Sequence, residues 1–426
     1  MRRKKSRFLW VPGILLLGGL VIAPRAIKAT VQESVAEAAS PTDHLYETPN
    51  PSLIDDEPLE VKPPLGLPAL SPVSVVPASN PLTKGKYELG RQLYFDPRIS
   101  LDGSVSCATC HNPDKGWTDN LKVSTGIDSL RGTRNSPTVT NTVYGKSMFW
   151  DGREPSLETQ SMGPMINPVE MGNPDHKMVI DRIREVPGYR EQFAKVFGTN
   201  VNLDGMSKAI ATFERVAALS GNSKYDRYNL GEVDELNESE KRGMVLFGLR
   251  LHPEDEYEPE VELQKAKCTL CHVGANFTDE LYHNLGIGWN EELKKFDDVG
   301  RAGAERIGHR NEASLGAFKT PTVRDVALSG PYMHDGSLNT LEEVMDHYNK
   351  GGTPNPALDP DMHALNLTPE ESADVVAFMK ALTGDDRKST EELLPNLPPN
   401  ADGTVPDARA ALTAPGMDKE GPVGSR

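Results

Sequence analysis

The stretch that decides the fold is Cys107-Ala108-Thr109-Cys110-His111. Two thiols three positions apart, followed directly by an imidazole, form the attachment signature of c-type haem. The thiols lie on one turn of backbone and bond to the haem vinyl groups, and the histidine that follows ligates the iron. The motif recurs as Cys268-Thr269-Leu270-Cys271-His272, and the two copies contain all 4 cysteines. We therefore predict two covalently bound haem c groups, with His111 and His272 as iron ligands.

Other uses of four cysteines fit this pattern less well. A four-cysteine zinc site would not need a histidine after each pair. A thioredoxin-like redox pair is expected in a βαβ context, which this sequence lacks. Structural disulfides in an exported protein are the remaining alternative. The doubled motif favours haem over all three.

The composition narrows the class of partner. The chain has 426 residues, which is long enough for two domains with hydrophobic cores, and its formal net charge is −16. An acidic chain of this kind is not expected to bind nucleic acid. An acidic surface would suit a basic redox protein, although acidic surfaces are common.

The N-terminus indicates export. A basic run, Arg2–Lys5, precedes the almost wholly apolar segment Phe8–Pro24. Val21-Ile22-Ala23 fits the small-residue pattern of a cleavage site, but Pro24 follows it. We predict that residues 1–29 form an export signal or an uncleaved membrane anchor near the lower length limit for a span. Both outcomes place the body outside the cytoplasm, in the periplasm, either free or anchored to the inner membrane.

The rest of the chain divides into a linker, two haem domains and a tail. Residues 30–80 are rich in proline and predict an extended linker, and residues 385–426 predict a disordered tail. Between them the fold class is all-α with long loops, in two cytochrome-c-like haem domains at 81–230 and 231–384. Helices are expected at 86–95, 178–197 with a break at Pro187, 205–219, after Asn237 with Glu240, at 341–348, and after Thr368.

At this point the sequence resembles the bacterial di-haem cytochrome c peroxidases, including the MauG branch. The resemblance covers nearly all of residues 81–384, and its markers are highly specific as a set. They are Leu89–Arg98 (LGRQLYFDPR), Arg134–Thr138 (RNSPT), Phe149–Arg153 (FWDGR), Thr320–Arg324 (TPTVR) and Gly330–Gly336 (GPYMHDG). The resemblance implies that the two haems face each other across a domain interface.

The resemblance assigns the peroxide chemistry to the first haem. In many members a second histidine caps that iron at rest, but the matching position here is Ile127, and no histidine occurs between His111 and His176. We therefore expect the first iron to be open. The family's distal acid maps onto Glu170, which would move a proton between the peroxide oxygens. Gln160 maps onto a second distal residue that hydrogen-bonds peroxide.

Two further features come from the resemblance. Trp150 maps onto the tryptophan between the two haems, which packs there and relays electrons. A calcium ion at the family's domain interface is held by one asparagine side chain and two backbone carbonyls. These ligands map onto Asn135, Ser329 and Pro331.

The sixth ligand of the second iron separates the branches of the family. In the peroxidases it is a methionine, which raises the reduction potential. The matching position here is Tyr348, and MauG-like members carry a tyrosine there. Met345 lies one helical turn earlier on the same face, so it is the competing ligand.

The function implied is a di-haem c-type peroxidase that reduces hydrogen peroxide to water with electrons from a small cytochrome c or copper protein. One alternative is a MauG-like oxidase that acts on a protein or organic substrate through a high-valent state. Tyr348 and the missing distal histidine favour it, whereas the lack of a tryptophan at Lys265–Lys267 counts against tryptophan modification. A non-catalytic di-haem electron carrier is the alternative from another class. Family members often form homodimers, but nothing in the sequence indicates an oligomeric state.

Overall fold

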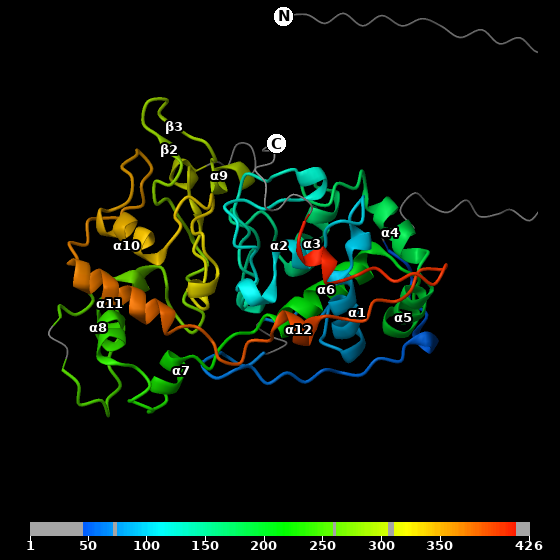
Figure 1. Ribbon diagram of the computed structural model, residues 1–426, viewed down its shortest axis with the longest axis horizontal. Coiled ribbons are helices and arrows are strands. Elements are labelled where there is room, and N and C mark those ends of the chain that lie inside the picture. Colours follow the sequence, from blue (N-terminus) through cyan, green and yellow to red (C-terminus); the bar gives the residue numbers. More distant parts are fainter. Residues whose placement is uncertain (1–45, 71–74, 259–260, 306–310, 415–426) are drawn as a thin grey trace, which may run out of the picture. The chain divides into compact units, whose positions relative to one another are not determined.

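The computed structural model describes residues 46–70, 75–258, 261–305 and 311–414 (Figure 1). Helices and long loops make up nearly all of this part of the chain, so the all-α prediction is confirmed. No helix among these residues is long and apolar enough to cross a membrane. The α-helices are α1 (Lys84–Phe95), α2 (Cys107–Cys110), α3 (Leu157–Ile166), α4 (His176–Arg184), α5 (Pro187–Phe197), α6 (Leu203–Ala217), α7 (Lys224–Tyr228), α8 (Glu238–Phe247), α9 (Arg301–Ala304), α10 (Leu341–Asn349), α11 (Pro369–Lys380) and α12 (Thr390–Leu393).

The strands of the described residues are only two residues long and form two small antiparallel pairs. β1 (Tyr282–His283) pairs with β4 (Phe318–Lys319), and β2 (Trp289–Asn290) pairs with β3 (Lys295–Phe296). They close loops of the second half of the chain and contribute little to its core.

The helix ends follow the local signals in the sequence. Asn237 and Glu240 form a reciprocal capping box at the start of α8, as predicted. Thr368 caps α11, in which Pro369 occupies the first turn, where its missing N–H costs nothing. Pro187 likewise begins α5, because the residue before a proline avoids helical angles; the predicted break in 178–197 is therefore present.

Buried apolar side chains form two main cores. The first contains residues of α1, α4, α5 and α6, and the second contains residues of α8, α10 and α11. The two cores repeat one packing arrangement, in which two helices cross at a glycine. A Cβ on Gly90 of α1 would lie 1.9 Å from the carbonyl oxygen of Ala209 in α6. A Cβ on Gly243 of α8 would lie 1.9 Å from the carbonyl oxygen of Asp374 in α11, so neither crossing tolerates a side chain.

The chain passes from the first core to the second between Ala218 and Tyr228. Ala218 belongs to the first core, whereas Tyr228 already belongs to the second. Tyr225, on the same short helix α7, makes edge contacts with Phe277 and Phe378 of the second half. These aromatic contacts tie α7 to the second core, close to the predicted boundary at 230–231, which stays a prediction.

The prediction of a disordered C-terminal tail is wrong for residues 385–414. Leu393 and Leu397 are buried in the first core, next to which α12 is drawn in Figure 1. The Thr390 backbone N–H donates to Asp114 at 2.9 Å, and the Arg91 guanidinium donates to the carbonyl of Leu393 at 3.1 Å. The polar composition of this tail reflects a loop-rich path whose backbone groups are bonded to the body. Residues 415–426 lie outside the described part.

The described part of the proline-rich segment before α1 is bonded to the body of the molecule. The Asn50 N–H donates to Gly198 O at 2.8 Å, and the Asn222 N–H donates to Leu65 O at 2.9 Å. The predicted export signal at residues 1–29 lies outside the described residues.

Candidate functional site

The first cysteine motif forms a single helical turn. α2 begins after Ser106, whose backbone N–H donates to the Thr109 hydroxyl at 2.8 Å. The His111 N–H closes the turn on Cys107 O at 3.0 Å. Because Cys107 and Cys110 are three residues apart on this turn, their thiols share one face. The second motif has the same form, since the His272 N–H donates to Cys268 O at 2.8 Å.

Both histidines are held by the same kind of hydrogen bond. His111 Nδ1 lies 3.2 Å from Trp117 O, and His272 Nδ1 lies 3.1 Å from Phe277 O. A carbonyl can only accept, so each Nδ1 carries the proton and each Nε2 keeps its lone pair. Burial lowers the pKa of His111 to about 4, and burial also lowers the pKa of His272, so both rings are neutral. Neutral imidazoles oriented through Nδ1 are suited to ligate a metal through Nε2.

Each motif lines a cavity. The first cavity has a volume of about 710 Å³, which lies within the range of cofactor sites, and it is lined by Cys107, Cys110 and His111. The second, about 210 Å³, is lined by Cys268, Cys271 and His272. Paired thiols, a neutral imidazole with a free Nε2 and an adjoining cavity fit covalently attached haem in both places. The second cavity is the smaller of the two, and its volume lies below that range.

Trp150 lies between the two cavities, because its side chain lines both. Its indole N–H donates to Asn135 O at 2.9 Å. The Trp150 carbonyl accepts from the Lys319 N–H of β4 at 2.8 Å. The indole is therefore bonded to the first half of the chain, and the Trp150 backbone is bonded to the second half.

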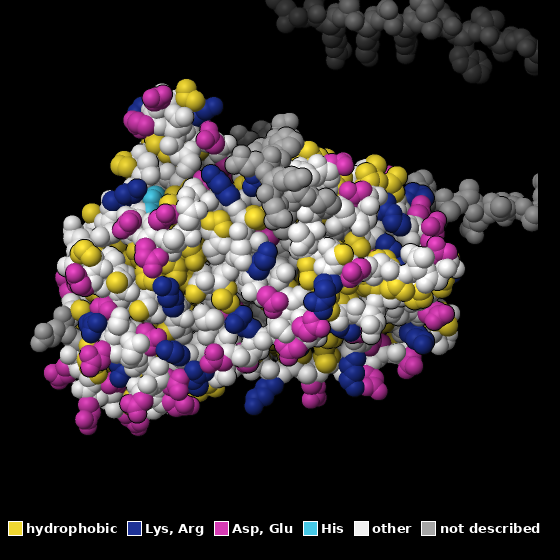
Figure 2. All heavy atoms as spheres, viewed as in Figure 1, with side chains coloured by type: hydrophobic (Ala, Val, Ile, Leu, Met, Phe, Trp, Pro, Cys, Tyr) yellow, Lys and Arg dark blue, Asp and Glu magenta, His cyan; other side chains and the backbone are white. Residues whose placement is uncertain are grey.

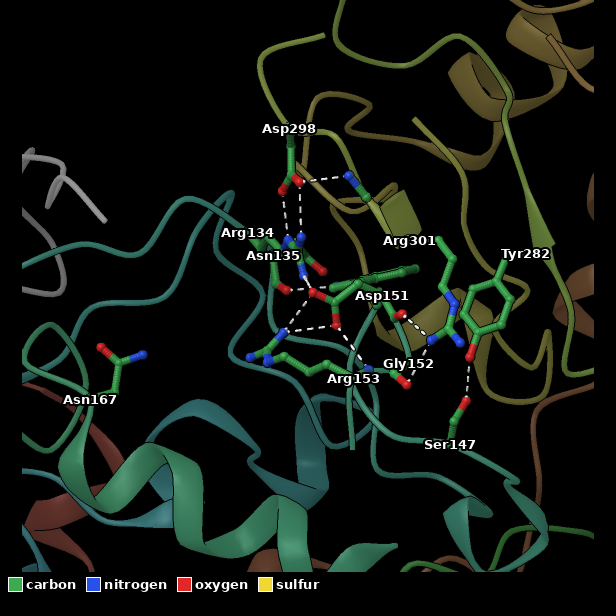
Figure 3. A network of polar contacts seen from close by, with 12 residues as sticks. Arg134, Asn135, Ser147, Asp151, Gly152, Arg153, Asn167, Tyr282, Asp298 and Arg301 are labelled. Carbon is green, nitrogen blue, oxygen red and sulfur yellow. Dashed lines mark hydrogen bonds and ion pairs between the residues drawn. The ribbon is translucent and has the colours of Figure 1, made fainter. Parts of the chain in front are cut away.

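The loop that carries Trp150 sits in a polar network that joins the two halves (Figure 3). Arg134 pairs with Asp151 at 2.7 Å and with Asp298 at 2.6 Å. Burial alone would raise the pKa of Asp298, but Arg134 outweighs burial and lowers it to about 2, so the carboxylate is ionised. From α9, Arg301 donates to the carbonyls of Asp151 at 3.0 Å and Gly152 at 2.9 Å.

Comparison with known proteins identifies the group to which this architecture belongs. Residues 84–234 match the family model described as di-haem cytochrome c peroxidase. The methylamine utilization protein MauG of Methylorubrum extorquens is 39% identical over 324 residues, covering 76% of this chain and 84% of the relative. The chain belongs to the di-haem cytochrome c peroxidase and MauG family.

Other relatives carry both kinds of name. Cytochrome c551 peroxidase of Nitrosomonas europaea is 34% identical over 341 residues, covering 79% of this chain and 90% of the relative. A solved MauG-like protein associated with microbial copper homeostasis has a TM-score of 0.64 at 30% identity, covering 75% of this chain and 95% of that one. The diheme peroxidase BthA of Burkholderia thailandensis has a TM-score of 0.62 at 21% identity, covering 82% and 98%, and shows the same fold. Family membership is shown, whereas the branch is not.

The two residues that the family resemblance assigns to peroxide lie in the first cavity. Gln160, on α3, and Glu170, in the loop that follows α3, both line it. One oxygen of Glu170 accepts a hydrogen bond from the Asn167 side-chain amide at 2.6 Å. This bond fixes the orientation of the Glu170 carboxyl group. Asn167 is labelled in Figure 3.

Ile127, at the position of the family's second axial histidine, has its side chain in the first core and is 5% exposed. Its backbone N–H donates to Glu170 O at 2.9 Å, so it supports the distal loop. Among the described residues that line the first cavity, His111 is the one histidine. The thioethers of Met148 and Met171 also line this cavity.

Both candidate ligands of the second iron line the second cavity. Tyr348 and Met345 are on α10, and Met345 is 2% exposed. Burial raises the pKa of Tyr348, with the Cys268 and Cys271 thiols adding to the shift. His347 points away, because its Nε2 lies 3.0 Å from Leu285 O on a different face of the helix. Met362 also lines the cavity, and sequence reasoning did not consider it.

The three residues proposed to hold calcium all line the second cavity. Asn135 donates its side-chain N–H to Leu121 O at 2.8 Å, which turns its carbonyl oxygen the other way. Ser329 and Pro331 flank Gly330, whose carbonyl is occupied by the Asn120 amide at 2.8 Å. Their own carbonyls are the oxygen ligands that calcium prefers. The calcium assignment stays a prediction.

One residue of the first cavity escaped the sequence reasoning. Glu214, on α6, lines the cavity although the periodicity of residues 205–219 predicts only an apolar helix face. The available sign was a carboxylate that directly follows Phe213, a residue of the predicted apolar face. Glutamate side chains are almost never fully buried unless they are paired, so burial of an acid at this position needs a physical explanation.

Proposed function

We propose that the protein is a di-haem c-type peroxidase, with one haem in each half, that reduces hydrogen peroxide to water. The overall reaction takes one peroxide, two electrons and two protons to two waters. The observation that carries the proposal is the content of the first cavity. Its described lining holds a single histidine, His111, which would hold the haem, together with Glu170 and Gln160, which would act on peroxide bound there.

The bound haems would supply a peroxide-binding iron and the redox equivalents for cleavage of the O–O bond. Glu170 then takes a proton from one peroxide oxygen and returns it to the leaving oxygen. The bond from Asn167 orients its carboxyl group for this task. Gln160 donates a hydrogen bond to peroxide, and Trp150 carries electrons between the halves because it borders both cavities.

The electron donor in this proposal is a small cytochrome c or copper protein outside the cytoplasm. The N-terminal basic run and apolar segment support export. Figure 2 shows many acidic side chains along the lower edge of the molecule, near α7 and α8. The exposed acids in this part of the sequence are Glu232, Asp234, Glu238, Glu254, Glu256 and Glu258. A basic donor would be attracted to that edge of the second half.

A MauG-like oxidase acting on a protein or organic substrate is the second candidate. The observation that favours it is Tyr348 in the lining of the second cavity. A phenolate ligand would lower the potential of the second iron, which suits a protein that takes electrons from a substrate. Met345 beside it would instead give the usual peroxidase ligation.

The test is the EPR spectrum of the ferric holoprotein, compared among the wild type, Tyr348→Met and Met345→Leu. We expect one high-spin and one low-spin iron, with the low-spin signal altered by Tyr348→Met and unchanged by Met345→Leu. The reverse pattern would make Met345 the ligand and weaken the MauG-like candidate. Two low-spin irons that fail to bind cyanide would refute both enzymes and leave an electron carrier.

Turnover separates the two enzymes. A peroxidase should oxidise two molecules of a reduced one-electron donor for each peroxide consumed. A protein that consumes peroxide without sustained donor oxidation, but with oxidation of an added protein substrate, would support the MauG-like candidate.

A further inference from the structure

Helix α6 brings a carboxyl group into the first cavity from the interior of the molecule. The helix is buried along nearly its whole length, because it packs against α1 and α3. Glu214 is 6% exposed and lines the cavity. Its Oε2 atom is buried and has no hydrogen-bond partner among the described residues. Buried polar atoms in proteins are almost always hydrogen-bonded, so an orphaned oxygen at a cavity wall indicates a partner inside the cavity.

The neighbouring cation does not neutralise Glu214. Arg215 forms a two-pronged pair with Glu158 of α3, at 2.6 and 2.9 Å. Asn80 adds a further hydrogen bond to Glu158 at 2.8 Å. Both terminal nitrogens of Arg215 are bonded to Glu158 rather than to Glu214, and the Arg215 Nε has no partner among the described residues. From α1, the Tyr94 hydroxyl donates to His111 O at 3.1 Å and is occupied as well. From α2, Cys107 contributes a sulfur that the haem would bond.

An ionised carboxylate in this position would be buried without a counter-ion, which costs several kcal/mol. Burial raises the pKa of Glu214 to about 8, although Arg215 offsets part of the shift. The group is therefore protonated at neutral pH and carries one O–H donor. A buried donor needs an acceptor, and the described chain offers none to Oε2.

We propose that Glu214 is a neutral carboxylic acid that donates a hydrogen bond to an oxygen acceptor held in the first cavity. The acceptor is either an ordered water or a carboxylate of the first haem, and both present the same chemistry to Glu214. The inference rests on the proposed haem in this cavity and goes beyond the roles of Glu170 and Gln160. Glu214 stores a proton beside the first haem, on the helix that packs against the distal helix α3.

The stored proton has a measurable consequence. When Glu214 ionises, an unpaired negative charge appears beside the haem, and that charge favours ferric over ferrous iron. The reduction potential of the first haem should therefore fall as pH rises through about 8. A purely structural glutamate, ionised throughout, would give no such dependence.

The experiment compares three holoproteins: wild type, Glu214→Gln and Asp325→Asn. Asp325 is a matched control, because it is 1% exposed, has an unpartnered Oδ2 and a pKa raised by burial, and lines neither cavity. Infrared difference spectra at neutral pH should show the carbonyl stretch of a protonated acid in wild type and Asp325→Asn, and its loss in Glu214→Gln. The potential of the first haem should depend on pH around 8 in wild type and Asp325→Asn, and not in Glu214→Gln.

Two results would overturn the proposal: a protonated-acid band that persists in Glu214→Gln, or a pH dependence of the potential that the substitution does not change. The crystal structure of the wild-type holoprotein distinguishes the two acceptors and needs no variant. Water or a haem carboxylate within hydrogen-bond distance of Oε2 supports the proposal, and the absence of any acceptor refutes it. Covalent haem content and peroxide turnover are measured separately, so failure of the proposed function is recognised independently of Glu214.

Discussion

The two halves of the molecule share a way of holding a haem and differ in what faces it. Each has a helix crossing at a glycine, Gly90 or Gly243, and a Cys-x-x-Cys-His turn whose histidine is fixed through Nδ1. The first cavity, about 710 Å³, is lined by carboxyl and amide groups. The second, about 210 Å³, contains the Tyr348 phenol in its lining, whereas methionines line both cavities. The attachment is thus a repeated module, and reactivity depends on the opposite wall of each cavity.

The largest expected effect comes from removing the acid of the first cavity. Glu170→Gln keeps the shape and the hydrogen bond from Asn167 but cannot accept a proton. We expect kcat/KM for peroxide to fall by roughly 100- to 10,000-fold, because general acid–base catalysis contributes that much. Steady-state peroxide consumption measures it, with Glu191→Gln, an exposed carboxylate on α5, as the control. A loss below tenfold would mean that the first cavity does not owe its reactivity to Glu170.

The stability of the second half depends on an ion pair in which both side chains are almost fully buried. Arg324 and Asp226 are 1% and 2% exposed at their side chains and form two hydrogen bonds of 2.8 Å. Arg324→Met leaves Asp226 buried without its counter-ion, with hydrogen bonds from Ser223 alone, and should lower the free energy of unfolding by about 3–5 kcal/mol. Chemical denaturation measures this change. Arg409→Met, which breaks an exposed pair with Glu391, should leave stability unchanged. Equal losses in the two variants would contradict the argument.

Most of the helical framework could be predicted, because its signals are local. Apolar periodicity, the Asn237 capping box and Pro187 specify where helices begin. The C-terminal segment could not be predicted in the same way. Leu393 and Leu397 are isolated apolar residues in a polar stretch, and only contacts with α1 and the first haem motif show that they are buried. Long-range contacts of this kind leave no periodic pattern in the sequence.

The residues of the candidate site also divide into those that the sequence predicts and those that only the structure reveals. The two haem motifs are contiguous, so spacing alone predicted them. Glu170, Gln160 and Trp150 came from the family resemblance, and the structure places all three at the first cavity. Glu214 could not be assigned because its significance lies in burial and a missing partner, which a sequence does not display.

Lowering the pH tests an ion pair that lies entirely in the first half, between Glu158 and Arg215. Burial would raise the pKa of Glu158, but Arg215 overcomes burial and lowers it from 4.5 to about 2. The pair therefore stabilises the fold fully above pH 4.5, and this contribution is lost as pH falls toward 2. The loss amounts to about 3 kcal/mol. Denaturation at a series of pH values should show a shallower acid dependence in Glu158→Gln than in wild type. Parallel curves would show that the pair is not coupled to folding.

The smallest effect concerns the junction between the halves. Arg301 donates to the carbonyls of Asp151 and Gly152, and thereby fixes from the second half the loop that carries Trp150. Arg301→Gln removes charge-assisted bonds worth about 1.5–3 kcal/mol in place, which should slow electron transfer between the haems roughly tenfold by loosening the indole.

Rapid-mixing spectroscopy of the half-reduced holoprotein measures this transfer rate. Arg153→Gln is the matched control, because Arg153 also contacts Asp151 but belongs to the same loop and is 36% exposed at its side chain. It should change the rate little, since it does not connect the halves. If both variants slow the transfer equally, the loop is held by charged groups near Asp151 in general, and the bonds from Arg301 of the second half have no special role. If neither does, the Trp150 carbonyl bond to Lys319 alone is enough to hold the indole between the two cavities.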